Sequence, residues 1–222
     1  MSLLKNIAPF SSLRTEILGI LDRQIRVRPY PKGVVIYCED DVATGMFIVV
    51  QGSVKTYTAN NKGRKLILRE CAVGDSFGVI EMLSGTTRLC SAITREDSLI
   101  AAINEGDFRS MLAKAPEIWK SLAIGLARDF KPLTWHLKNL ALFDVNGRVK
   151  NLLKAASTES DGQLIVNQRL TQQDIADRIG ATRERVSFVL SELRKAGVLS
   201  ERDGRFVLAE NAGENGVERE SG

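Results

Sequence analysis

The pattern of hydrophobic and polar positions divides the chain into three parts. Between residues 27 and 103, short apolar segments alternate with turn signals rich in glycine, asparagine and aspartate. Short segments at nearly regular spacing predict an antiparallel β structure, a small barrel or sandwich. The expected strands are residues 34–37, 46–50, 54–58, 65–70, 90–94 and 99–103. Helices are expected on either side, at residues 12–24 and 107–114.

A long helix is predicted next, from about residue 117 to residue 144. Its apolar residues recur at alternating spacings of four and three, the a/d pattern of a two-helix coiled coil. This seam consists of Trp119, Ala123, Leu126, Phe130, Leu133, Leu137 and Leu140. The pattern favours a homodimer through the last five of these residues, and packing of the helix on its own β domain is the alternative. Pro132 lacks a backbone donor and clashes with the carbonyl of Arg128, so we expect a kink or break there.

Residues 170–199 predict two short helices joined by a tight turn. Thr171 and Thr182 are placed to cap the two helices, and Gly180 suits the left-handed turn between them. The exposed face of the second helix is expected to begin with Arg183, Glu184, Arg185 and Ser187. A helix that enters the DNA major groove carries its base-reading groups at this place. An ordinary helical hairpin is the alternative, but the polar first turn favours a DNA-binding helix-turn-helix.

Further elements are expected on both sides of the helix-turn-helix. Asp144 is placed to cap a helix over residues 145–155, and the polar residues 157–162 predict a loop before a strand at residues 164–166. Asp203 and Gly204 are a strong hairpin signal between residues 198–201 and 205–208, which adds a β wing. The expected domains are residues 1–115, the dimerisation helix 116–143, the DNA-binding domain 144–210 and a disordered tail 211–222.

Composition narrows the function classes. The chain has 222 residues, a net charge of +4 and no apolar run long enough for a transmembrane helix. The mild basic bias is compatible with nucleic-acid binding, and the lack of a secretory signal predicts a cytoplasmic protein without a membrane partner. With a single histidine and no nucleophile–base spacing, the sequence predicts no enzyme. Three separated cysteines predict buried thiols rather than a metal cluster or disulfide framework; they are Cys38, Cys71 and Cys90.

The order of β roll, long helix and winged helix-turn-helix resembles the Crp/Fnr family of bacterial transcription regulators. The most specific motifs are KGVVIY, Gly52 with Val54, VGDSFG, NLALFDVNGRV and the helix-turn-helix itself. The resemblance covers nearly the whole chain. It implies an α+β fold with an N-terminal cyclic-nucleotide-binding-like β roll of the jelly-roll type, a dimerisation helix and a C-terminal winged helix-turn-helix. The implied partners are double-stranded DNA at a palindromic operator, a second copy of the chain, RNA polymerase and a small-molecule effector.

The resemblance also implies roles for residues of the second helix. Arg183 and Glu184 match family positions that contact base edges, where arginine suits guanine O6/N7 and a carboxylate accepts from cytosine N4. Ser187 matches a position that faces the bases in part of the family. Phe188 replaces a second base-reading arginine of many members, which predicts an altered half-site with a thymine-methyl contact. The expected DNA-binding set is completed by Thr182 and Arg185, the latter through phosphate.

The effector pocket departs from the pattern of cyclic-nucleotide-binding members. These use a glutamate after the β-roll glycine for the ribose, and an arginine–serine pair for the cyclic phosphate. Gly78 and Arg88 match, but valine replaces the glutamate and leucine follows the arginine. The expected pocket residues are Gly78, Val79, Ile80, Arg88, Leu89, Cys90, Leu133 and Thr134, the last two in place of a base-contacting threonine–serine pair. Glu81 is a candidate to substitute for the missing acid, although its place two positions further along a short helix is expected to point it elsewhere.

These departures argue against cyclic AMP and favour another effector or none. An iron–sulfur cluster is not supported, because no cysteine cluster lies near the N-terminus. Haem is not supported either, because His136 is the only histidine and a solitary histidine on a helix is more often a packing residue. Oxidation of Cys90 would require an exposed thiol with a lowered pKa. The alternative function is a cyclic-nucleotide-binding regulatory module that acts through protein contacts.

Overall fold

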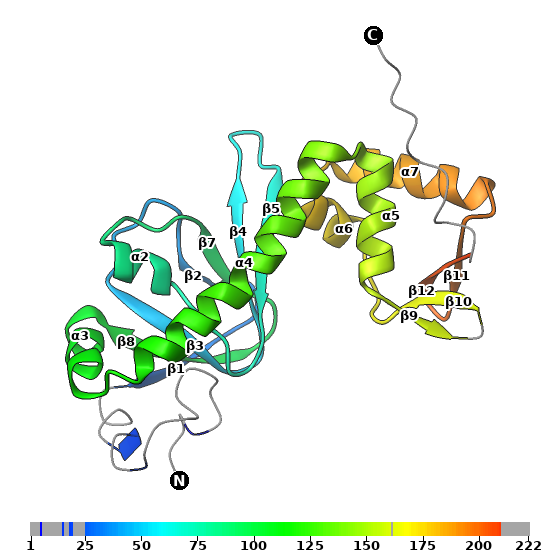
Figure 1. Ribbon diagram of the computed structural model, residues 1–222. Helices are drawn as coiled ribbons and strands as arrows, with labels where there is room; N and C mark the ends of the chain where they lie inside the picture. The colour runs from blue at the N-terminus through cyan, green and yellow to red at the C-terminus, as the bar shows by residue number, and fades with distance from the viewer. Residues whose placement is uncertain (1–4, 6–14, 16–17, 20–24, 161, 210–222) are drawn as a thin grey trace. The chain divides into compact units, whose positions relative to one another are not determined.

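The computed structural model describes residues 5, 15, 18–19, 25–160 and 162–209 (Figure 1). The chain divides into two compact units. The first unit comprises residues 1–58 and 68–133, and the second comprises residues 59–67 and 134–222. The tail expected at 211–222 lies outside the described residues, as does most of the helix expected at 12–24.

The first unit is built on two four-stranded sheets. One has the order β1 (Arg26–Tyr30), β8 (Ser98–Asn104), β3 (Gly45–Gln51), β6 (Ser76–Phe77). The other has the order β2 (Val35–Tyr37), β7 (Ser91–Thr94), β4 (Val54–Ala59), β5 (Lys65–Cys71). Strand β3 runs antiparallel to β8, and β4 runs antiparallel to β7. All six predicted strands are therefore confirmed, with ends shifted by at most one residue.

Strands β1 and β6 were not predicted. In β1, four of the five residues are exposed, so the strand lacks the run of buried apolar residues that marks β3 and β8. It lies at the edge of its sheet, where Pro29 is tolerated because no further strand needs its missing N–H. Strand β6 has only two residues, which is too short for any periodic pattern.

Strand β3 separates two hydrophobic clusters. Successive side chains of a strand point to opposite faces. Met46 and Ile48 accordingly pack in a cluster with Phe108 and Met111 of the following helix. Phe47 and Val49 belong to a second cluster between the sheets, with the aromatic rings of Tyr37 and Phe77. The ring centroids of Phe47 and Phe77 lie 5.3 Å apart in a stacked arrangement. Both faces of β3 are thus covered, which explains its nearly continuous apolar sequence.

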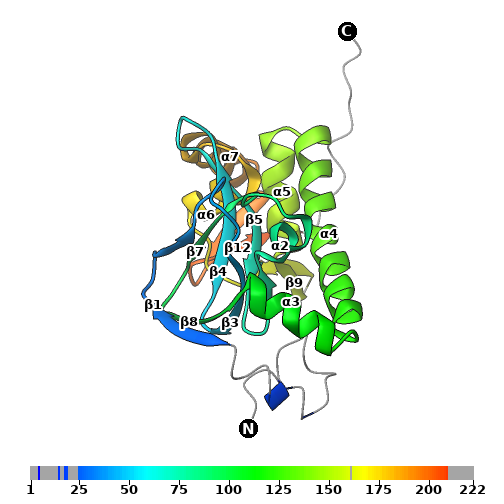
Figure 2. The same ribbon diagram turned by 90° about the vertical axis from the view of Figure 1, so that its left-hand side faces the viewer.

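From residue 25 onward, three helices belong wholly or partly to the first unit: α2 (Val79–Ser84), α3 (Glu105–Lys114) and α4 (Ile118–Leu142). In the view of Figure 2, α2, α3 and the first half of α4 lie to the right of strands β1, β7 and β8. The helix predicted at 107–114 is confirmed and starts two residues earlier, where the Asn104 side chain accepts from the backbone N–H of Asp107.

The expected break at Pro132 is wrong, because α4 continues through this residue as one helix. Pro132 removes a single N–H→O=C bond, to the carbonyl of Arg128. Both residues are exposed, so water can satisfy the released carbonyl. A bend without a break stays a prediction.

Besides the end of α4, the described residues of the second unit form three helices and a four-stranded sheet. The helices are α5 (Val145–Ala155), α6 (Gln172–Ile179) and α7 (Arg183–Lys195). The strands have the order β11 (Leu199–Arg202), β12 (Arg205–Leu208), β10 (Gln163–Val166), β9 (Ser157–Ser160). The predicted helices, wing and strand at 164–166 are confirmed. The loop predicted at 157–162 is partly wrong: β9 is a polar edge strand held to β10 by backbone pairing, so its side chains carry no apolar signal.

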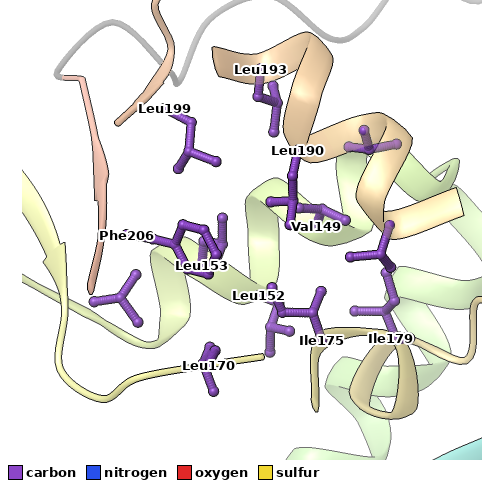
Figure 3. Packing of buried hydrophobic residues seen from close by; sticks show 14 of the residues in the cluster. Val149, Leu152, Leu153, Leu170, Ile175, Ile179, Leu190, Leu193, Leu199 and Phe206 are labelled. Atoms are coloured by element: carbon purple, nitrogen blue, oxygen red, sulfur yellow. The ribbon is translucent and has the colours of Figure 1, made fainter. Parts of the chain in front are cut away.

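One hydrophobic core joins the helices and the wing of the second unit (Figure 3). Val149 and Leu153 of α5 are fully buried, as are Ile175 of α6 and Leu190 of α7. Phe206 adds the wing to the same core. Since α7 buries its apolar stripe here, its opposite face is directed to the surface.

The three cysteines differ in environment. Cys71 is buried, Cys90 is partly buried and Cys38 is exposed, so the prediction of buried thiols is wrong for Cys38. Burial raises the pKa of Cys90 to about 11 and that of Cys71 to about 12. Both thiols therefore stay protonated at neutral pH, and Cys90 does not meet the requirement of a lowered pKa for redox sensing.

The core of the second unit predicts a large effect of truncation at Leu190. We expect Leu190→Ala to lower the free energy of unfolding by about 2–5 kcal/mol, because the site is completely buried and a cavity remains. Urea denaturation followed by circular dichroism measures this loss. Ser191→Ala, at the exposed neighbour on the same helix, is the control and should stay within about 0.5 kcal/mol of the wild type. Equal effects of both substitutions would contradict the core assignment.

Thiol burial predicts the order of cysteine reactivity. With the folded protein at pH 8, a water-soluble disulfide reagent should react rapidly with one thiol, Cys38, and slowly with Cys71 and Cys90, which are both shielded and protonated. Cys38→Ser should abolish the fast phase, whereas Cys71→Ser should leave it unchanged. A fast phase that survives in Cys38→Ser would show that the burial of the other thiols is wrong.

Candidate nucleic-acid interface and ligand cavity

The two helices of the helix-turn-helix are fixed by local hydrogen bonds. Thr171 and Asp174 form a complete capping box at the start of α6. Gly180 has φ 64°, the left-handed conformation that the predicted turn requires, and the N–H of Ala181 donates to Ala176. The hydroxyl of Thr182 accepts from the N–H of Arg185 at 3.3 Å, so α7 begins at Arg183.

The first turns of α7 present the predicted residues to the surface. Thr182, Arg183, Glu184 and Arg185 are exposed, Ser187 is half-buried, and Phe188 is 56% exposed. The buried stripe of α7 consists of Val186, Val189, Leu190 and Leu193. The predicted DNA-binding residues therefore share the face that points away from the core. Neither Arg183 nor Arg185 forms an ion pair within the described part of the chain, so both charges are available to an anionic partner.

Arg185 and Phe188 interact with each other on this face. The guanidinium carbon of Arg185 lies 5.3 Å from the centroid of the Phe188 ring, within the range of a cation–π contact. The spacing of three residues on a helix brings the two side chains together. This i, i+3 spacing of an arginine and a phenylalanine is the signal in the sequence that marks the contact. The contact holds an exposed aromatic ring and a positive charge in one place.

Three other basic residues of α7 and the wing have partners within the protein. Arg194 pairs with Glu201 at 3.0 Å, which ties α7 to the wing, and Lys195 pairs with Glu192 at 3.0 Å. Arg202 donates to Gln163 at 3.3 Å. The arginines of α7 that have no ion-pair partner among the described residues are therefore Arg183 and Arg185, at its N-terminal end.

A cavity of about 160 Å³ lies within the first unit, between strands of the β roll, α2 and α4. Of the predicted pocket residues, six contribute to its lining: Gly78, Val79, Ile80, Leu89, Cys90 and Leu133. The lining also contains Arg69, Glu81 and Asp129, which the prediction did not include. Two predicted residues are placed differently. Arg88 is buried and does not contribute to the lining, and Thr134 belongs to the second unit.

Arg88 is held inside the protein by its own neighbours. Its side chain is 2% exposed; Nη1 donates to the carbonyl of Gly78 at 3.0 Å and Nη2 to that of Gly45 at 2.5 Å. Its guanidinium carbon lies 4.3 Å above the centroid of the Tyr37 ring, and burial raises the pKa of Tyr37 so that the ring hydroxyl stays neutral. These contacts occupy the group that the resemblance assigns to a cyclic phosphate.

Glu81 supplies a carboxylate next to Arg88. Its Oε2 lies 3.7 Å from Arg88 Nη1, and its Oε1 accepts from the N–H of Leu89 at 3.2 Å. Glu81 is only 4% exposed and lines the cavity, so the expectation that it points elsewhere is wrong. Val79 instead packs into the hydrophobic cluster beside β3. The orientation of α2 could not be predicted because six residues give too little periodicity.

A second charged group lies on another wall of the cavity. Arg69 Nη1 donates to Asp129 Oδ2 at 2.7 Å and to the Ser76 carbonyl at 2.8 Å, while Nη2 lies 3.5 Å from Asp75 Oδ1. Burial raises the pKa of Asp129, and the adjacent guanidinium opposes this effect. The sequence could not reveal this cluster, because Arg69 and Asp129 are 60 positions apart and meet only in the folded chain.

His136 has the environment of a packing residue. It lies edge-on to the ring of Trp135, with centroids 5.3 Å apart, and burial lowers its pKa so that the imidazole is neutral at pH 7. Among the described residues, no group of three or more potential metal-ligating side chains lies together. No helix in the described ranges has the length and apolar character needed to cross a membrane.

Comparisons with known proteins agree with this architecture. Residues 27–115 match the model of the cyclic nucleotide-binding domain, and residues 147–212 match the model of the Crp-like helix-turn-helix domain. A CRP-like cAMP-activated global transcriptional regulator from Mycobacterium tuberculosis is 30% identical over 203 residues, covering 90% of each chain. A cyclic AMP receptor protein from Thermus thermophilus is 26% identical over 203 residues, covering 91% of this chain and 93% of the relative.

A solved structure shows the same fold. The c-di-GMP-responsive global regulator CLP of Xanthomonas campestris matches with a TM-score of 0.76 and 23% identity, covering 88% of this chain and 99% of that chain. The relatives are transcription regulators rather than enzymes, as the sequence predicted. The α+β architecture of a β roll followed by a winged helix-turn-helix is confirmed. The chain belongs to the Crp/Fnr family of transcription regulators, with a DNA-binding helix-turn-helix at its C-terminal end.

Proposed function

We propose that the chain acts as a homodimer that reads a palindromic operator through α7 and responds to an effector other than cyclic AMP. The observation that carries the proposal is the exposed N-terminal end of α7, which presents Arg183, Glu184 and Arg185 opposite a fully buried stripe. In this proposal, residues 1–115 form the sensor, 116–143 the dimerisation helix and 144–210 the DNA-binding domain. Contact with RNA polymerase in the cytoplasm follows from the role of a transcription regulator.

The base contacts follow from side-chain chemistry. Arg183 suits the O6/N7 edge of guanine, and Glu184 accepts from cytosine N4. Phe188 offers an apolar surface to a thymine methyl group, with Arg185 held beside it. Ser187 adds a contact to the bases, and Arg185 and Thr182 lie at the helix start, where phosphate contacts fix its position. Because a second base-reading arginine is replaced by Phe188, the half-site differs from that of family members that carry the arginine.

The surface of α4 supports a dimer. Phe130 is 70% and Leu137 is 68% exposed, and Leu133 and Leu140 are 41% and 42% exposed. Leu126 continues the same seam and is half-buried. Large apolar side chains in one stripe are unfavourable in water and are typical of an interface. A second copy of α4, with the same stripe, would cover them in the manner of a coiled coil.

The contacts of Arg88 support an effector different from cyclic AMP. The names of the mycobacterial and Thermus relatives link them to cyclic AMP. Here Glu81 already pairs with the phosphate-binding arginine, and Val79 provides no group for a ribose hydroxyl. The alternative, a module that acts through protein contacts alone, does not account for the exposed charges of Arg183 and Arg185 on α7.

A gel shift at graded salt separates the two functions, because a regulator shows sequence preference and a steep salt dependence of DNA binding.

The assignment of α7 predicts a defined change of specificity. Arg183→Ala should lose about 1–3 kcal/mol of discrimination at one guanine of each half-site. Selection of binding sites from a random pool, followed by quantitative gel shifts, measures this change. Arg205→Ala, an exposed arginine of the wing, is the control and should weaken binding to all sequences alike or not at all. An unchanged consensus with Arg183→Ala would refute the base contact.

The assignment of the α4 seam predicts the oligomeric state. Leu137→Lys should shift the chain from dimer to monomer, because a charge would be buried at the centre of the interface. Leu142→Lys is the matched control, since Leu142 is 65% exposed against 68% for Leu137 but lies outside the a/d seam. Sedimentation equilibrium distinguishes the states. A wild-type monomer, or a dimer that Leu137→Lys leaves intact, would contradict the seam.

A further inference from the structure

The charges around the cavity are unbalanced. Glu81 and Asp129 contribute carboxylates to its lining, and Arg69 contributes the only positive charge among the described lining residues. Their partners outside the lining are Arg88, which is buried, and Asp75, whose side chain is 38% exposed. This cluster has three carboxylates and two guanidinium groups, which leaves one negative charge in excess.

Neither guanidinium is free to receive an anion. Arg88 is bonded to two carbonyls, faces Glu81 and lies over the Tyr37 ring, all within the protein interior. Arg69 is shared between Asp129 and Asp75. A phosphate in the cavity would have to break one of these arrangements or remain near uncompensated carboxylates. Either outcome is costly, and most costly at Arg88 and Glu81, whose side chains are only 1% and 5% exposed, because breaking a buried ion pair leaves an uncompensated charge.

One carboxylate oxygen of the cluster retains the capacity to bind a donor. Both oxygens of Glu81 are engaged, Oε1 by the N–H of Leu89 and Oε2 by Arg88. Asp129 Oδ2 accepts from Arg69, whereas Asp129 Oδ1 has no partner within the described part of the chain. The pKa of Asp129 is raised, so its negative charge is incompletely compensated. A positively charged donor at Oδ1 would compensate it.

The size and the remaining lining of the cavity limit the ligand further. Leu68, Phe77, Leu122 and Leu126 contribute apolar surface. The volume of about 160 Å³ is similar to that of an apolar cavity of roughly 150 Å³ that accommodates benzene in another protein. A nucleotide, with its base, sugar and phosphate, is much larger than one benzene ring. The lining therefore suits a single ring or a chain of similar size.

We propose that the cavity binds a small, mainly apolar molecule with one positive charge, of the arylalkylamine class, whose ammonium group donates to Asp129. Glu81 acts as the specificity-determining residue that excludes anions, because its carboxylate occupies the arginine that a phosphate would need. This proposal names the ligand class for the effector site of the proposed function, on which its regulatory meaning rests.

A series of matched ligands tests the charge preference with the full-length wild-type chain. The probes 2-phenylethylamine, 2-phenylethanol and phenylacetate share a ring and a short arm but are cationic, neutral and anionic at pH 7. Isothermal titration calorimetry should give the tightest binding for the amine, about tenfold or more weaker binding for the alcohol, and none for phenylacetate or cyclic AMP. Binding of phenylacetate or cyclic AMP as tight as that of the amine would overturn the proposal, and so would an equal affinity for amine and alcohol.

Two substitutions test the named carboxylates. Asp129→Asn should weaken binding of the amine about tenfold and leave binding of the alcohol unchanged. Glu81→Gln should make phenylacetate binding measurable, because it removes a carboxylate of the lining that repels the anion and leaves the positive charge of Arg88 behind it uncompensated. Glu117→Gln removes an exposed carboxylate outside the lining and serves as the charge control, with no change for any probe. Circular dichroism establishes that each variant is folded. If folded Asp129→Asn keeps the full preference for the amine, the proposed anchor is wrong.

The failure of this proposal can be separated from failure of the proposed function. Ligand binding is measured without DNA, and operator selection is measured without ligand. A wild-type chain that selects an operator but binds none of the probes overturns the ligand class and leaves the DNA-binding proposal intact. A chain that binds the amine but selects no sequence overturns the proposed function and retains the cavity assignment.

Discussion

The packing of the apolar stripe of α7 is the constraint on which the recognition surface depends. Leu190 is completely buried among residues of α5, α6 and the wing, so α7 cannot rotate without exposing its own core. The capping box of α6 and the left-handed Gly180 set where α7 starts. Together these contacts place Arg183 and Glu184 on the surface, where a partner can bind, and Val186 and Val189 in the core. Stability and recognition are thus two consequences of one helical periodicity.

In the first unit, the buried ion pair of Glu81 and Arg88 constrains the wall of the cavity in the way that the buried stripe constrains α7. A buried ion pair contributes little net stability, but removal of one partner leaves an uncompensated charge and is strongly destabilising. Glu81 and Arg88 therefore hold each other in place beside the cavity, and neither can be replaced alone without cost.

Local patterns predicted most of the fold but only part of the cavity. Alternation of apolar residues located β3 and β8, and caps at Thr171 and Thr182 located the helix-turn-helix, because these signals lie within a few residues of the elements that they mark. The edge strands β1 and β9 were not predicted, since most of their residues are exposed and backbone pairing to one neighbouring strand defines them. The pairing of Arg69 with Asp129 could not be predicted for a different reason. It joins β5 to α4 across 60 positions, and no short-range pattern encodes it.

Leu126 and Leu133 connect the cavity of the first unit to the apolar seam of α4. Both line the cavity, and both belong to the apolar seam of α4. A molecule that displaces these side chains also changes the surface offered to a second helix. By thermodynamic linkage, self-association must then alter the affinity for that molecule by the same factor. Ligand titrations of this chain should accordingly depend on protein concentration, and the dose at which it responds in a cell would vary with its own abundance.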